Sequence, residues 1–161
     1  MAERKPSHFQ KEQESRIGFS FETTVLLRQI ANRETNIRQL PEGQLYQITG
    51  FARFLNRVDL GMQWSDFNRR DSVIQHNYQD NIRIRNLIVP VIQEFLFPDK
   101  QMSSSLSRDE KVQIQKTIMH YRDLLYKVSR REDLLPQERV DLLKILDVSH
   151  RLRVQQFQAS Q

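Results

Sequence analysis

The sequence is poor in the residues that covalent braces, sheets and membrane spans require. It contains no cysteine among its 161 residues, which excludes disulfide bonds, thiolate chemistry and cysteine-ligated zinc. Four glycines and five prolines leave few residues for the turns of a β-sheet or for a glycine-rich phosphate loop. No apolar run approaches the roughly 18 residues of a membrane span, and no signal peptide is recognisable at the start. We therefore expect an all-α protein that is soluble and cytoplasmic.

The residues that are abundant are typical of a globular helical domain with a modest basic excess. Hydrophobic residues make up 38% of the chain, which is enough for a core, so the chain should fold. The net charge is +5, and most of the basic residues are arginines. Because acids and bases alternate along the chain and form no basic block, the pattern indicates solvated helix faces. Nucleic acid is therefore a possible partner that the charge distribution does not favour.

Apolar periodicity and composition predict one helical domain, in a bundle of about five helices. The domain spans residues 18–155, between a disordered lead-in at 1–17 and a frayed C-terminus at 156–161. Within it, a serine-rich linker at 98–107 separates the N-terminal helices of residues 18–97 from a helical hairpin at 108–155.

The first helix is predicted to run from Phe21 to about Asn32. Ser20 precedes it, and a serine hydroxyl at this position accepts a hydrogen bond from an otherwise unpaired amide. The core-facing residues are expected to be Val25, Leu26 and Ile30.

The second helix is predicted to begin at Pro41 and to end near Val58, before Asp59 and Gly61. Proline suits a first helical position because its missing N–H would have no partner there. Apolar residues then follow at 3,4,3 spacing, which places them on one face: Leu45, Ile48, Ala52 and Leu55.

The third helix is predicted to begin after Ser65 and to end at Leu96, with a kink or break near Pro90. Proline cannot donate to the helical hydrogen bonds and disfavours the helical conformation of the residue before it. Residues 82–85 read Ile-Arg-Ile-Arg and alternate like a strand. Since no partner strand is apparent, a helix is the better interpretation.

Two further helices are predicted to form an antiparallel hairpin at the C-terminal end. Ser107 and Glu110 form a capping box that opens the fourth helix, and Pro136 opens the fifth, which runs to about Val154. The short connection between them favours antiparallel packing. The fourth helix carries its core stripe at 4,3,4,3 spacing: Ile114, Ile118, Tyr121, Leu125 and Val128.

A second apolar row runs along the same fourth helix. Val112, Met119 and Tyr126 follow at a spacing of seven, roughly 140° around the helix from the core stripe. One interpretation is that the helix lies between two layers and buries both sides. The other is that the row binds a partner, since exposed apolar rows mark interaction sites.

A polar candidate lies on the back of the second helix. Tyr46, Gly50, Arg53 and Arg57 share one face, opposite the core stripe. An aromatic ring beside arginines suits an anion or a nucleic-acid contact, although a solvated arginine face with ordinary ion pairs is the commoner arrangement.

A catalytic reading of the third helix is rejected. Ser72, His76 and Asp80 follow at four-residue steps, but they lie opposite Ile74 and Tyr78, on the expected solvent side. A nucleophile there would lack an oxyanion site and a dry pocket. We predict no enzyme, no metal site and no cofactor.

These observations favour a non-enzymatic helical module: an adaptor, chaperone-like or regulatory subunit that binds another protein, or a second copy of itself, through an apolar helix face. The alternative is a helical nucleic-acid-binding protein that uses arginine-rich faces.

Overall fold

The computed structural model describes residues 18–64, 72–99 and 106–159, with side chains described outside 59–64, 72–82 and 156–159. All regular structure within these ranges is helical, so the predicted all-α bundle is confirmed. The elements are α2 (Phe21–Ala31), the short 3₁₀ helix η1 (Ile37–Gln39), α3 (Glu42–Trp64), α4 (Ser72–Leu96), α5 (Arg108–Ser129) and α6 (Pro136–Ala159).

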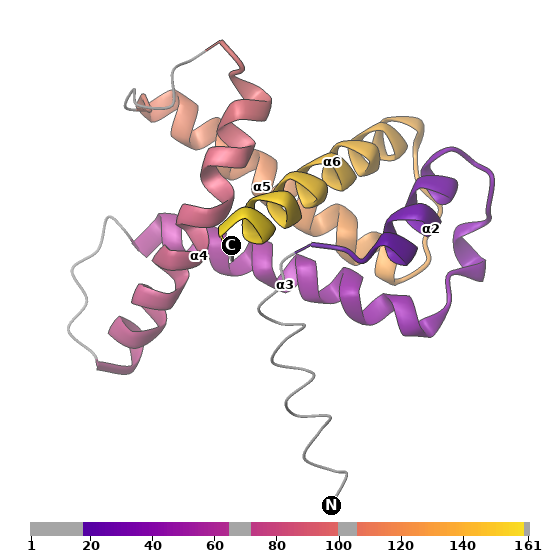
Figure 1. Ribbon diagram of the computed structural model, residues 1–161, viewed down its shortest axis with the longest axis horizontal. Helices are drawn as coiled ribbons and strands as arrows, with labels where there is room; N and C mark the ends of the chain where they lie inside the picture. Colours follow the sequence, from indigo (N-terminus) through magenta and orange to yellow (C-terminus); the bar gives the residue numbers. More distant parts are fainter. Residues whose placement is uncertain (1–17, 65–71, 100–105, 160–161) are drawn as a thin grey trace, which may run out of the picture.

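Helix α3 packs extensively against α5 and α4, while α6 lies across α2, α4 and α5 (Figure 1). Every helix contributes to one continuous apolar core. The surfaces described below are therefore carried by helices that share this core.

Helix α2 begins where the sequence predicts, but it buries a different face. The Ser20 hydroxyl accepts from the amide of Thr23, as expected of a cap. Leu27 is fully buried, whereas Val25 is only half-buried, so the expectation that Val25 faces the core is wrong. The reason is Thr23, which is itself buried because its hydroxyl donates to Gln44 of α3. This bond rotates the helix so that its buried side is centred on Leu27.

Helix α3 has the predicted core face but a later end. Ile48, Ala52 and Leu55 are buried, and the helix starts directly after Pro41. It does not stop near Val58 but continues to Trp64. One glycine in a helix costs only about 1 kcal/mol, so Gly61 lowers helix stability without ending the helix.

Helix α4 passes through Pro90 without a break. It is helical from Ser72 to Leu96, which excludes both the break and the strand considered for residues 82–85. The kink stays a prediction. The predicted cap, Ser65, lies outside the described residues.

Helices α5 and α6 form the predicted hairpin. Ser107 and Glu110 make both bonds of the capping box, and the expected core stripe of α5 is buried. Lys127 pairs with Glu138 at 2.8 Å, and His120 with Asp141 at 2.8 Å. The α5 residue number falls from 127 to 120 while the α6 residue number rises from 138 to 141, so the two helices are antiparallel.

Glu138 joins the two helices of this hairpin at their connection. Its carboxylate accepts from the Leu135 amide at 2.7 Å and from the Lys127 ammonium group at 2.8 Å. Burial alone would raise its pKa, but these two hydrogen bonds and the charge of Lys127 outweigh it, so the pKa lies below the usual glutamate value.

The chain before α2 is fixed against the C-terminal half of α6. The Phe19 amide donates to the Ser149 hydroxyl at 2.8 Å. Gly18 has φ +117, and a Cβ on it would lie 2.7 Å from Cγ of Arg153 and 2.9 Å from Oγ of Ser149. Glycine is therefore required here both by the backbone conformation and by the close approach of α6.

We expect Gly18→Ala to lower the free energy of unfolding by about 1–3 kcal/mol, because it adds strain at positive φ and overlap with α6. Gly50→Ala is the matched control: a Cβ at Gly50 meets nothing within 4 Å, and the residue lies inside α3. It should stabilise the protein by about 0.5–1 kcal/mol. Urea denaturation measures both values, and a neutral Gly18→Ala would contradict the packing described.

We expect Glu138→Gln to lower stability at pH 7 by about 1–2 kcal/mol, because charge-assisted hydrogen bonds are lost. Since the folded-state pKa of Glu138 is depressed, its contribution is present above the unfolded pKa and disappears as the pH falls through the folded one. The variant should therefore lose less stability than the wild type between pH 7 and pH 3. The control is Glu132→Gln, which removes the exposed pair with Arg130 and should change stability by less than about 0.5 kcal/mol.

Candidate functional site

The second apolar row of α5 is neither fully buried nor fully exposed. Val112 is 40% exposed, while Met119 and Tyr126 are half-buried. Tyr126 also packs partly against the core. The row therefore forms a strip of partly exposed apolar atoms along α5, which no described element covers completely.

The arginine face of α3 lies opposite its core stripe. Tyr46 is 47% exposed, and Arg53 and Arg57 are exposed as well. Gly50, half-buried, leaves open space between them.

The two predicted surfaces lie on helices that pack against each other, α3 and α5. The Arg122 guanidinium donates to the side-chain oxygen of Asn56 at 3.0 Å, although the two residues are 66 positions apart. Arg122 lies beside the apolar row of α5, whereas Asn56 is turned by about 100° from its neighbour Arg57. The bond therefore joins the two helices at one edge of their contact. We refer to the two faces together as the α3–α5 surface and define it by six residues: Tyr46, Arg53, Arg57, Val112, Met119 and Tyr126.

The charge of the α3–α5 surface is positive. Arg53 and Lys116 have no ion pair with any residue that the structure describes. Lys116 stands in the apolar row, one turn from Val112 and from Met119. The nearby acid, Asp123, is paired with Arg122 at 3.1 Å. A partner would therefore meet apolar side chains together with Arg53 and Lys116, two cations that have no acidic partner among the described residues.

An exposed apolar row on α6 was not predicted from the sequence. Its members are Leu135, just before the helix, and Val140, Leu143 and Val154. The signal was present, because α6 carries more apolar residues than one face can bury, as Leu142-Leu143 illustrates.

Several charges beside the α6 row are paired with one another. Arg151 contacts Asp147 at 3.3 Å and Glu94 at 3.8 Å, and Lys144 lies 4.0 Å from Asp141. Arg139, which precedes Val140, has no ion pair with a described residue, so a cation stands beside this row as well.

The residues considered for catalysis are only partly described. Ser72, His76 and Asp80 lie on α4, and their side chains are outside the description. His120 bonds to the largely buried Asp141. Burial, helped by the charge of Asp141, raises the pKa of Tyr121 to about 12, so its hydroxyl keeps its proton near neutral pH and is no phenolate nucleophile.

In the described part of the chain, no three histidine or acidic side chains are grouped as a metal would require. None of the described helices combines the length and apolar character needed to cross a bilayer.

No protein-family model, no curated protein and no solved structure matches this chain.

Proposed function

We propose that this protein is a non-enzymatic helical interaction module, an adaptor, chaperone-like or regulatory subunit of the cytoplasm, that binds another protein through the α3–α5 surface. The observation that carries the proposal is the half-exposed apolar row of α5 with Lys116 standing in it, a cation that, like Arg53 on α3, has no ion pair with a described residue. Apolar area supplies binding free energy, and the uncompensated charge selects the partner.

The partner that fits this surface is an amphipathic helix with acidic residues beside its apolar stripe. Its stripe would cover Val112, Met119 and Tyr126, which are spaced to face one side of a helix. Its carboxylates would approach Arg53 and Lys116. A second copy of the chain fits less well, because two copies of one positive surface repel each other.

The alternative, nucleic acid, is supported by the exposed Tyr46 beside Arg53 and Arg57. A base can stack on such a ring while the arginines meet phosphates. The apolar row of α5 has no use in that interpretation, which makes it second. Binding to nucleic acid would weaken steeply with added salt, in proportion to the phosphates contacted.

The proposal is tested by photo-crosslinking from position 112 in extract of the source cell, with and without nuclease. We expect one protein adduct, mapping to an acidic amphipathic helix, and we expect its loss in the Met119→Glu and Arg53→Glu variants. Position 140 is the matched control, because Val140 is also an exposed valine on a helix, 47% against 40%, but lies on α6. It should give no such adduct.

Several outcomes would overturn the proposal. Adducts only to RNA or DNA would favour the alternative, and the same adduct from position 140 would transfer the function to the α6 row. Light scattering that shows a dimer broken by Val112→Glu would mean self-association. Circular dichroism identifies a variant that fails to fold; if Met119→Glu unfolds, the more exposed Val112→Glu takes its place.

A further inference from the structure

Helices α2 and α5 end in the same kind of turn, and each has an arginine where glycine is usual. Arg33 has φ 64 and Arg131 has φ 59, the left-handed region that side chains other than glycine rarely adopt. Each turn is a Schellman motif, defined by two backbone bonds beyond the helix. After α2, the Glu34 N–H donates to the Gln29 carbonyl (2.8 Å) and the Arg33 N–H to the Ile30 carbonyl (3.2 Å). After α5, the Glu132 N–H donates to the Lys127 carbonyl (3.3 Å) and the Arg131 N–H to the Val128 carbonyl (2.9 Å).

The two arginines differ in what their side chains do. Arg131 has a structural role, because its Nε donates to the Leu40 carbonyl at 2.9 Å and joins the turn after α5 to the chain that precedes α3. The guanidinium of Arg33 makes no hydrogen bond or ion pair with the residues described. Nothing in the packing of the described residues therefore explains why Arg33 occupies a conformation suited to glycine.

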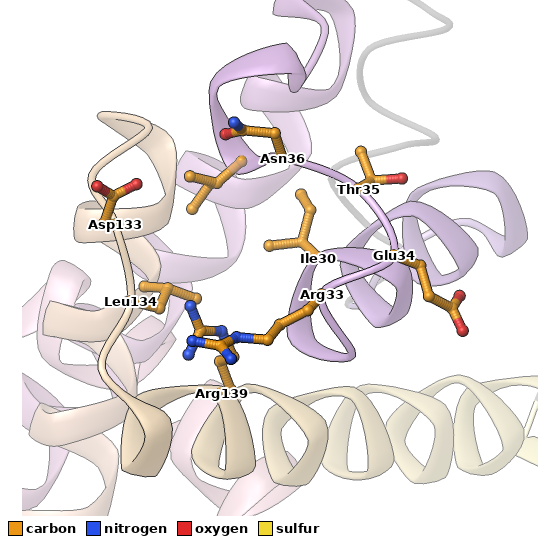
Figure 2. Close-up of a pocket in the computed structure, with 9 residues that line it drawn as sticks. Ile30, Arg33, Glu34, Thr35, Asn36, Asp133, Leu134 and Arg139 are labelled. Atoms are coloured by element: carbon orange, nitrogen blue, oxygen red, sulfur yellow. The ribbon is translucent and has the colours of Figure 1, made fainter.

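The Arg33 side chain instead lines a pocket of about 320 Å³ between the two turns. Arg139, from the first turn of α6, lines the same pocket, and its guanidinium has no partner within the described ranges either. Figure 2 shows both side chains extending toward Leu134, Arg33 from the end of α2 and Arg139 from α6. Two like charges directed into one pocket repel each other unless an anion lies between them.

The two acids that line the pocket do not pair with these arginines in the described part of the chain. Glu34 points away from Leu134 and the two arginines in Figure 2, and Asp133 is already paired with Arg38 at 3.2 Å. The apolar walls are buried core residues, which exclude water from one side and make charge interactions stronger. They are Ile30, Ile37 and Leu134.

We propose that this pocket binds the phosphate group of a small phosphate monoester, held between Arg33 and Arg139. A guanidinium presents paired N–H donors that match phosphate oxygens, and two arginines balance the charge of one dianion. The volume is within the range of small-molecule sites. The site is separate from the α3–α5 surface and does not depend on the function proposed for it.

The test titrates the full chain with inorganic phosphate and with phenyl phosphate, followed by NMR at the arginine Nε–H groups and at the amides of residues 33–36 and 134–139. We expect saturable shifts in the wild type, with phenyl phosphate binding at least as tightly as phosphate. Arg33→Gly and Arg139→Gln should each weaken binding on the order of tenfold or more. Glu34→Gln should bind at least as tightly as the wild type, because it removes an acid from the rim.

Arg33→Gly also separates binding from folding. Glycine suits the left-handed position, so the variant should melt at or above the wild-type temperature while losing phosphate. Arg108→Gln is the matched control, since it removes an exposed arginine at the start of α5 that does not line the pocket and also lacks a described partner; its affinity should equal that of the wild type. Equal losses in Arg108→Gln and Arg33→Gly, shifts that do not saturate, or malonate binding more tightly than phenyl phosphate would each overturn the proposal.

Discussion

Packing of α3 against α5 is the interaction on which the rest of the structure depends. Ile48 and Leu55 of α3 and Ile118 of α5 are at most 1% exposed, and each such side chain contributes roughly 1.5–3 kcal/mol when it is buried. Helix α4 then packs on α3, and α6 closes over α5. Because the inward faces of α3 and α5 are fixed by this core, the orientation of their outward faces is fixed as well, and the bond between Arg122 and Asn56 holds one edge of the contact.

The sequence predicted what depends on local pattern. The capping box at Ser107 and the core stripe of α5 follow from residues within one or two turns of each other, and both are confirmed. The buried side of α2 was missed because it depends on a bond from Thr23 to Gln44, 21 positions away. The predicted end of α3 near Val58 was wrong because Gly61 is too weak a helix breaker to end the helix, which continues to Trp64.

The candidate sites follow the same division. Each row of the α3–α5 surface is visible as a helical periodicity, but the packing of α3 against α5 is a tertiary fact that no pattern within one helix contains. The pocket was not foreseen at all, because Arg33 and Arg139 are over a hundred positions apart and become neighbours only when the turns after α2 and α5 meet. A signal did exist: the turns after α2 and α5 both contain the pair Arg-Glu, with no glycine nearby to close the turn.

The contact of Gly18 with Ser149 and Arg153 has a consequence for how the domain is attached to anything else. It places the start of the described chain beside the last turns of α6, while the arginine pocket lies at the other end of that helix, some 14 residues or about 21 Å away from Arg153. Both ends of the described chain therefore lie toward one end of α6, and a ligand that enters the arginine pocket approaches the other end.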